Sequence, residues 1–279
     1  MKLEIISRHA IGNQHPMPIL FIHGMMHGAW CWDVHFLDYF ARNGYTAYAV
    51  NLRGHGKSEG RENLRWTRIA DYVEDVANAV QQLPGLPILI GHSLGGFVVQ
   101  KYLENYQVPG AVLLSSPPPA GLFPAILRIA RRRPLVFAKT NVTLSLRPLI
   151  ATPELAREAF FSPDFPEKEL LTYWKQMQDD SYRAFLDMAL LDRPQPYKVK
   201  TRLLILGAEL DNMLKPYEIE ATAMAYNTQA EIIRGVAHNS MLEQRWESVA
   251  ERILLWLEEF KLEKNREEVL NKVPSSAIH

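Results

Sequence analysis

A serine flanked by small residues is the strongest chemical signal in the sequence. Residues 91–96 read Gly-His-Ser-Leu-Gly-Gly, follow the apolar run 87–90 and open a stretch of helical period at 94–106. Small neighbours permit a sharp strand-to-helix turn that exposes the serine hydroxyl, and a helix start directs free N–H groups to the same place. The pattern therefore predicts that Ser93 is a nucleophile and that the backbone N–H of Leu94 stabilises an oxyanion.

A serine hydroxyl is a weak nucleophile without a base, and the base needs an acid that fixes its tautomer. The apolar run 203–206 is followed by Asp211, and the next run, 231–234, is followed by His238. Both side chains leave the carboxyl end of a predicted strand, the edge at which parallel sheets bind ligands. We therefore predict Asp211 as the acid and His238 as the base, with Glu209 as a competitor for the acid role.

A second oxyanion donor is expected from the loop that follows the apolar run 19–22. There Met25 supplies a backbone N–H beside the predicted serine turn. We interpret His23, in the same loop, as a hydrogen-bonded structural residue and not as a proton carrier. The same interpretation applies to three further histidines, His27, His55 and His92.

The pattern of apolar residues predicts the strands and helices that carry these residues. Short apolar runs bounded by Gly or Pro alternate with longer segments of helical period, which is typical of an α/β fold with a mostly parallel sheet and helices on both faces. Strands are expected at 3–7, 19–22, 46–50, 88–90, 111–115, 202–206 and 231–234. Helices are expected between them at 32–42, 67–83, 94–106, 216–226 and 241–260.

The alternation stops between residues 117 and 196, where helical segments separated by proline replace strands. This stretch is too long for an ordinary loop, so we predict a helical insertion at 117–196 within a core formed by 1–116 and 197–260. Residues 261–279 are polar and are expected to form a solvated tail. Helices in the insertion are expected at 125–132, 153–161, 167–178 and 182–191.

Composition excludes several function classes. Apolar residues make up 47% of the 279 residues and charged residues 22%, which is typical of a packed globular chain and not of a disordered or collagen-like one. Lys plus Arg and Asp plus Glu both number 31, so no overall field favours nucleic acid as a partner. The single cysteine, Cys31, cannot form an internal disulfide, and the histidine spacing indicates no metal site. We expect a cofactor-independent protein in the reducing cytoplasm.

The apolar segments bear on membranes and on the ligand. No signal peptide is apparent, and the apolar runs are far shorter than the roughly 20 residues that span a bilayer. The run Arg131-Arg132-Arg133 beside apolar residues could mark weak contact with a lipid surface, although such runs are more often solvated. The insertion holds bulky apolar residues that could build a pocket for a small apolar ester or acyl substrate. These are Phe123, Leu127, Phe137, Phe160, Phe161, Phe165, Trp174, Phe185 and Met188.

The sequence resembles the alpha/beta-hydrolase superfamily, in its lysophospholipase and monoacylglycerol-lipase-like group. The residues that carry this resemblance are 23–24, 51–58 and 91–96 together with Asp211 and His238. The resemblance extends from about residue 19 to 260, and residues 23–32 are also similar to plant methylesterases and hydroxynitrile lyases. It implies the alpha/beta-hydrolase fold with the insertion as a lid. It also implies the roles of a serine hydrolase: Ser93 as nucleophile, His238 as base, Asp211 as acid, and the Met25 and Leu94 amides as the oxyanion hole.

Three local features qualify this resemblance. Asn51 stands where relatives commonly have Asp, and Ala237 stands where Gly often precedes the histidine, so the subfamily stays open. The loop 53–58 lacks the Gly and Lys spacing of a nucleotide-binding loop and is interpreted as a structural turn. A serine at the elbow argues against dehalogenases and epoxide hydrolases, which use a carboxylate nucleophile there.

The expected function is the hydrolysis of carboxylic esters through an acyl-enzyme on Ser93. Thioesters, carbon–carbon bonds and peracid chemistry use the same residues and stay open as alternatives. A third possibility is a member of the fold that binds a small molecule without turnover. Residue types alone do not decide the acyl chain, the alcohol or the oligomeric state, because the shape of the lid and loops sets them.

Overall fold

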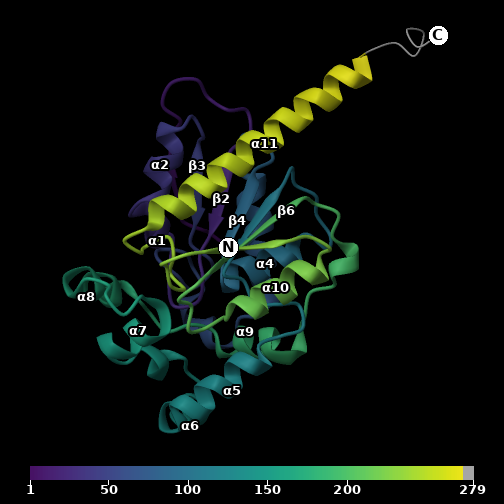
Figure 1. The fold of residues 1–279 in the computed structure, drawn as a ribbon. Helices are drawn as coiled ribbons and strands as arrows, with labels where there is room; N and C mark the ends of the chain where they lie inside the picture. The colour runs from purple at the N-terminus through teal and green to yellow at the C-terminus, as the bar shows by residue number, and fades with distance from the viewer. Residues whose placement is uncertain (273–279) are drawn as a thin grey trace.

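The computed structural model describes the backbone of residues 1–272 and the side chains of residues 1–260. A seven-stranded sheet runs through the molecule with the strand order β1-β3-β2-β4-β5-β6-β7 (Figure 1). Only β1 is antiparallel to its neighbour among the described pairs, so the predicted mostly parallel sheet is confirmed. The strands are β1 (Ile5–Arg8), β2 (Ile19–Ile22), β3 (Ala47–Val50), β4 (Ile88–His92), β5 (Ala111–Leu114), β6 (Leu203–Ala208) and β7 (Ala230–Ile233).

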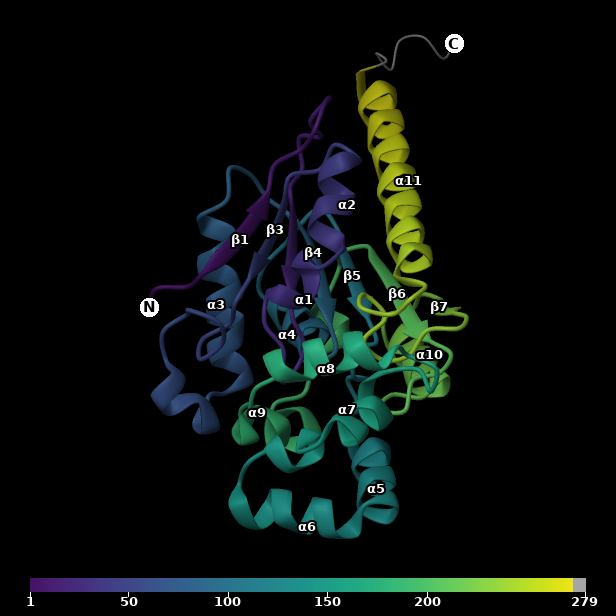
Figure 2. The same cartoon turned by 90° about the vertical axis from the view of Figure 1, so that its left-hand side faces the viewer.

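Helices cover both faces of this sheet, as predicted (Figure 2). Successive side chains on a strand point to opposite faces, and on β2 Phe21 enters one core while Leu20 and Ile22 enter the other. The Phe21 face packs against α1 (Trp30–Asp33), α2 (Phe36–Arg42) and the long C-terminal helix α11 (Trp246–Lys272). The opposite face packs against α3 (Ile69–Gln81), α4 (Leu94–Tyr102) and α10 (Pro216–Ala225).

Three predicted helices of the core differ from the expected bounds by more than two residues. The helix expected at 94–106 ends at Tyr102. The helix expected at 32–42 is two helices, because His35 leaves the helical conformation at φ −138° and stacks its ring on Trp246 at 4.5 Å. The helix expected from 241 begins only at Trp246, because the chain before it is held in turns that bond to the insertion. Its backbone continues to residue 272, and the last seven residues of the predicted polar tail lie outside the described residues.

Helices fill the stretch between β5 and β6, beyond the carboxyl ends of the parallel strands (Figure 2). One of them, α6, is absent from the helices that the sequence predicts. Pro134 occupies the first position of α6, where its missing N–H and fixed φ are tolerated. The helices are α5 (Phe123–Arg132), α6 (Pro134–Thr143), α7 (Pro153–Phe160), α8 (Glu167–Gln176) and α9 (Tyr182–Leu186), with a π-helical turn at Asp187–Leu191. Short 3-10 turns lie at Arg61–Trp66, Arg147–Ile150 and Pro196–Lys198.

Candidate active site

Ser93 lies in a sharp turn between β4 and α4. Its backbone has φ 50° and ψ −119°, a left-handed conformation that costs a non-glycine residue about 1–3 kcal/mol. The side chain is only partly buried, so the hydroxyl is accessible. Leu94 is the first residue of α4, and the first N–H groups of a helix have no partner within it. The turn therefore presents a hydroxyl beside at least one backbone donor.

The glycines around Ser93 allow α4 to begin against the end of β2. A Cβ on Gly95 would lie 2.3 Å from the carbonyl oxygen of Ile22 and 2.5 Å from that of His23. A Cβ on Gly96 would lie 2.5 Å from the Cβ of Ser116. These close approaches bring the start of α4 next to the loop after β2, which carries Met25.

We expect Gly95→Ala to destabilise the fold by about 1–3 kcal/mol, because the added methyl group meets backbone oxygens that cannot rotate away. Urea unfolding measures the change. Gly85→Ala is the matched control, since nothing lies closer than 4.0 Å to the Cβ it would add. Equal unfolding free energies for the two variants would contradict the close packing at Gly95.

The predicted acid and base lie in direct contact. Asp211 follows β6 and is fully buried, and the Nδ1 of His238, which follows β7, donates to its Oδ2 at 2.7 Å. Because the Nδ1 proton faces the carboxylate, the Nε2 atom of a neutral imidazole is left as a proton acceptor. The competing carboxylate, Glu209, is exposed and accepts the backbone N–H of Gly235 at 2.9 Å. The structure thus places Asp211, and not Glu209, against the imidazole.

The loop after β2 is fixed by its own histidines. The Nδ1 of His23 donates to the carbonyl of Gly24 at 2.9 Å, which orients the peptide that carries the Met25 N–H. The Nδ1 of His27 donates to the carbonyl of Met25 at 2.6 Å. A Cβ on Gly24 would lie 3.1 Å from the Cβ of Ser93, so this loop passes directly beside the serine.

These histidines are buried and neutral. The Nε2 of His23 accepts the Leu52 N–H at 3.2 Å, and the Nε2 of His27 accepts from the side chain of Asn239 at 3.0 Å. An imidazole with one donating and one accepting nitrogen carries no charge. Burial is the largest cause that lowers the pKa of His23 to about 3 and the pKa of His27 to about 4. His92 donates from Nε2 to the carbonyl of His238 at 2.9 Å, and burial lowers its pKa well below the usual value.

We expect acid to destabilise the fold through these groups. A histidine whose pKa is lower in the folded state than in the unfolded chain contributes stability above its unfolded value of about 6.5, and this stability is lost as the pH falls towards the folded value. The pKa is about 4 for His27 and about 3 for His23. Each imidazole should therefore lower the free energy of unfolding by about 2 kcal/mol when the pH falls from 7.5 to 5. Urea unfolding at several pH values measures the loss, and His27→Gln should make it shallower. A flat profile would contradict the neutral assignment.

The sequence did not reveal Asp180, a buried carboxylate of the insertion. Its Oδ2 accepts the Met26 N–H at 2.7 Å and the Nε2 of His55 at 3.0 Å, and its Oδ1 accepts the Tyr72 hydroxyl at 3.2 Å. Burial alone would raise its pKa, but the charge of His55 and these hydrogen bonds lower it to about 2. A helix start at Ser181, whose hydroxyl accepts the Ala184 N–H, was the one local signal available.

His55 differs from the other buried histidines. Its Nδ1 faces the carbonyl oxygen of Arg53 at 3.0 Å, while its Nε2 faces Asp180. Both ring nitrogens therefore face oxygen atoms. This buried pairing of His55 with Asp180 joins the insertion to the loop of residues 53–58.

The insertion also contacts the base. The Phe160 ring stacks on the His238 ring with centroids 5.7 Å apart, and the Phe160 carbonyl accepts the Asn239 N–H at 2.9 Å. The carboxylate of Glu243 accepts from the backbone and hydroxyl of Ser162 at 2.6 and 2.8 Å. These contacts fix the loop after His238 to the end of α7.

An inner chamber of about 60 Å³ is lined by Ser93, Met25 and His238 together with apolar residues of the insertion. Of the bulky insertion residues that the sequence suggested for a pocket, Phe160, Phe185 and Met188 line it. Phe161 and Phe165 are instead buried in the packing of the insertion, and Phe123 is 70% exposed. The candidate nucleophile and base thus share one apolar chamber.

The sequence is similar to a known protein family and to several characterised proteins. Residues 19–252 match the family described as "Alpha/beta hydrolase family". The chain is 37% identical over 109 residues to a monoacylglycerol lipase of Mycolicibacterium smegmatis, covering 35% of this chain and 38% of the lipase. It is 35% identical over 112 residues to a non-heme chloroperoxidase of Streptomyces lividans, covering 39% of this chain and 40% of that protein. These matches span less than half the length of either relative.

A solved structure matches over nearly the whole chain. The monoacylglycerol lipase of Paleococcus ferrophilus has a TM-score of 0.69 and 20% identity, with 93% of this chain and 100% of that chain covered. At this identity the likeness concerns the fold alone. The family match, in contrast, includes the serine turn and the segments that carry Asp211 and His238. The chain belongs to the alpha/beta hydrolase family.

Proposed function

We propose that the protein is a serine hydrolase that cleaves carboxylic esters through an acyl-enzyme on Ser93. The observation that carries the proposal is that Ser93 and His238 line the same chamber, with His238 bonded to Asp211 at 2.7 Å. Two similar proteins are named monoacylglycerol lipase, and such a name agrees with ester chemistry. In this proposal Ser93 is the nucleophile, His238 the base and Asp211 the acid, and the Met25 and Leu94 amides are the oxyanion donors.

In the first half of the reaction, the Ser93 Oγ attacks the ester carbonyl and His238 Nε2 accepts its proton. Asp211 stabilises the resulting imidazolium and holds its orientation. The N–H groups of Met25 and Leu94 donate to the oxyanion, and losing one such donor typically costs about 2.7–4 kcal/mol of transition-state stabilisation. The imidazolium then protonates the alkoxide, the carbon–oxygen bond breaks, and the alcohol leaves.

In the second half, His238 removes a proton from water, and the hydroxide attacks the acyl-enzyme. The oxyanion returns to the same two donors, and its collapse releases the carboxylic acid while His238 returns the proton to Ser93. No cofactor is needed for this balance. The neutral His23 and His27 hold the Met25 peptide and take no proton in the cycle.

Under the same proposal, the helices of residues 117–196 act as a lid over the serine turn. Their side chains make the inner chamber apolar, which favours a substrate with an apolar acyl or aromatic group. Each additional buried methylene should favour binding by about 0.8 kcal/mol until the chamber is full. We therefore expect medium acyl chains to react faster than acetyl esters.

The test combines two measurements on the wild-type protein. Hydrolysis of p-nitrophenyl esters from acetate to long chains reports turnover and chain preference, and a fluorophosphonate probe followed by peptide mapping reports a reactive serine. Turnover with labelling at Ser93 would support the proposal. Labelling without turnover of any ester would favour a thioester or a carbon–carbon bond as the substrate. Neither labelling nor turnover would favour a binding role.

A further inference from the structure

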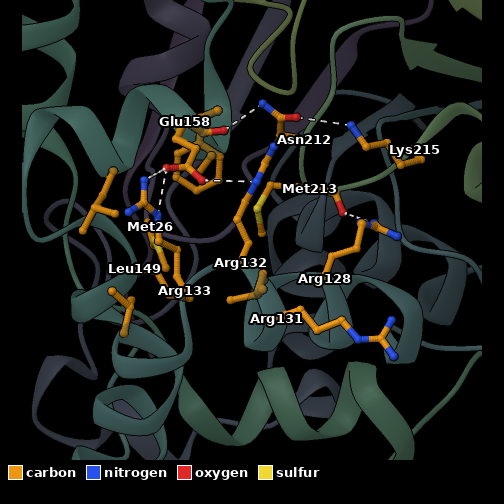
Figure 3. A pocket seen from close by; sticks show the side chains of 15 residues that line it. Met26, Arg128, Arg131, Arg132, Arg133, Leu149, Glu158, Asn212, Met213 and Lys215 are labelled. Atoms are coloured by element: carbon orange, nitrogen blue, oxygen red, sulfur yellow. Dashed lines mark hydrogen bonds and ion pairs between the residues drawn. The ribbon is translucent and has the colours of Figure 1, made fainter.

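A second, larger chamber adjoins the first. It has a volume of about 420 Å³ and is drawn in Figure 3. Five residues line both chambers, and all of them are apolar: Met26, Ile129, Leu149, Phe160 and Met213. The two chambers therefore adjoin across these apolar side chains, with Ser93 on the inner side.

Cationic side chains surround the outer chamber. Residues 117–153 hold six Lys and Arg residues and no Asp or Glu, although the chain as a whole has no net charge. Four of these cations line the chamber, and α10 adds the neighbouring Lys215. Glu158 is the single carboxylate among the lining residues. The lining cations are Arg128, Arg131, Arg132, Arg133 and Lys215.

The carboxylates nearby do not balance this charge. Arg132 and Arg133 share Glu158 (Figure 3), and Arg128 pairs with the buried carboxylate of Glu218. Among the residues that the structure describes, Arg131 pairs with no carboxylate, and its guanidinium points away from the cluster around Glu158 in Figure 3.

Lys215 is a part-buried cation of this set. Its ammonium group donates to the Asp211 carbonyl at 2.8 Å and to the Asn212 side chain at 3.2 Å, and no carboxylate of the described residues accepts from it. Burial lowers its pKa, the charge of Asp211 acts in the opposite direction, and Arg128 and Arg132 lower it further. The outer chamber thus combines apolar walls with an excess of positive charge, which an anion would compensate.

We propose that the outer chamber binds the anionic end of an amphiphilic ester, whose apolar segment packs between the five shared residues and reaches Ser93. The anion is a carboxylate or a phosphate group, since both accept hydrogen bonds from guanidinium and ammonium groups. This inference rests on the proposed ester hydrolysis and adds its substrate class. Arg131, Arg132 and Arg133 are exposed, but they line the same chamber as the part-buried Arg128 and Lys215, which favours a small anion over a membrane surface.

The test compares two esters of equal chain length, monomethyl octanedioate with one free carboxylate and dimethyl octanedioate with none, by methanol release. Arg131→Gln/Arg132→Gln removes two lining charges and leaves Glu158 paired with Arg133. The matched control is Lys139→Gln/Lys175→Gln, which removes two exposed lysines of the insertion that do not line the chamber. We expect the lining variant to lower the ratio of kcat/KM for the monoester to that for the diester about tenfold, and the control to change it less than about twofold.

Binding to Ser93→Ala separates this inference from the proposed function. Calorimetry should show tighter binding of the monoester than of the diester, and this preference should be lost with the two lining charges. Such binding without turnover by the wild type would refute ester hydrolysis and keep the anion site. Turnover with no monoester preference, or an equal loss in both double variants, would refute the anion site.

Two further probes identify the source of the anion. Stronger competition by octyl phosphate than by octanoate would assign a phosphate group, and the reverse order would assign a carboxylate. The protein could instead sediment with phosphatidylserine vesicles. If the lining variant lost this sedimentation and the wild type showed no monoester preference, the proposal would be overturned in favour of a membrane surface.

Discussion

Ser93→Ala is expected to lower kcat for a medium-chain p-nitrophenyl ester by about 10⁴- to 10⁶-fold, with little change in KM. The alanine removes the atom that bonds to the acyl group but leaves the chamber and the oxyanion donors in place. His238→Ala should lower kcat by a similar factor, because His238 is the group that accepts the serine proton in this mechanism. Asp211→Asn should lower kcat about 10⁴-fold, because the amide disfavours the imidazole tautomer that leaves Nε2 free.

The double variant tests whether these residues act as one unit. Residues of one catalytic unit are strongly non-additive, so Ser93→Ala/His238→Ala should be no slower than either single variant. Ser240→Ala is the matched control, because this serine is also close to His238 in the chain and is buried. Its hydroxyl has no hydrogen-bond partner in the described part of the chain. Retained turnover in Ser93→Ala, or losses that multiply in the double variant, would contradict the proposed mechanism.

The sheet and the order of the site residues could be predicted because both depend on local pattern. The seven strands are short apolar runs, and the structure shifts their ends by only one or two residues. A parallel sheet brings the ends of successive strands to one edge, so Asp211 and His238 had to emerge near Ser93 once β4, β6 and β7 were recognised. The catalytic roles of these residues stay predictions until activity is measured.

Features that depend on tertiary contacts were not predictable. Pro134 can end a helix or begin one, and only the packing of α6 decides between them. The run 131–133 resembles any solvated basic stretch, because its lining of a cavity depends on α7 and α10. Asn51 shows the same limit, because it donates to Glu4 and accepts from Ala29, and both partners lie far from it in the chain.

Asp180 is the clearest example, because its partners lie more than a hundred residues away in the chain. Breaking a buried ion pair by removing one partner typically costs about 3–5 kcal/mol, since the other charge stays buried. We therefore expect Asp180→Asn to destabilise the fold by about that amount in urea unfolding. Tyr72→Phe, which removes one neutral donor to the same carboxylate, should cost only about 1 kcal/mol.

A double-mutant cycle tests the pairing with His55. His55→Gln combined with Asp180→Asn should be less destabilised than the sum of the two single variants, because no charge is then left unpaired. The Asp180→Asn variant should also lower kcat more than it changes KM, since Asp180 holds the Met26 N–H and so positions the adjacent oxyanion donor. Additive losses would contradict the ion pair, and an unchanged kcat would contradict the positioning role.

The pH dependence of the free energy of unfolding tests whether the negative charge of Asp180 stabilises the fold. The pKa of Asp180 is lowered to about 2, so its carboxylate stabilises the fold above the ordinary value of about 3.8, and this stability is lost as the pH falls towards 2. A shift of this size corresponds to about 2 kcal/mol of stability, which the wild type should lose over that range and Asp180→Asn should not. The charge of Asp180 also raises the pKa of His23 and His27, so the difference between the two unfolding free energies reports Asp180 together with the buried histidines that its charge affects. If that difference were the same at pH 2 as at pH 6, the low pKa and the buried ion pair would both be wrong.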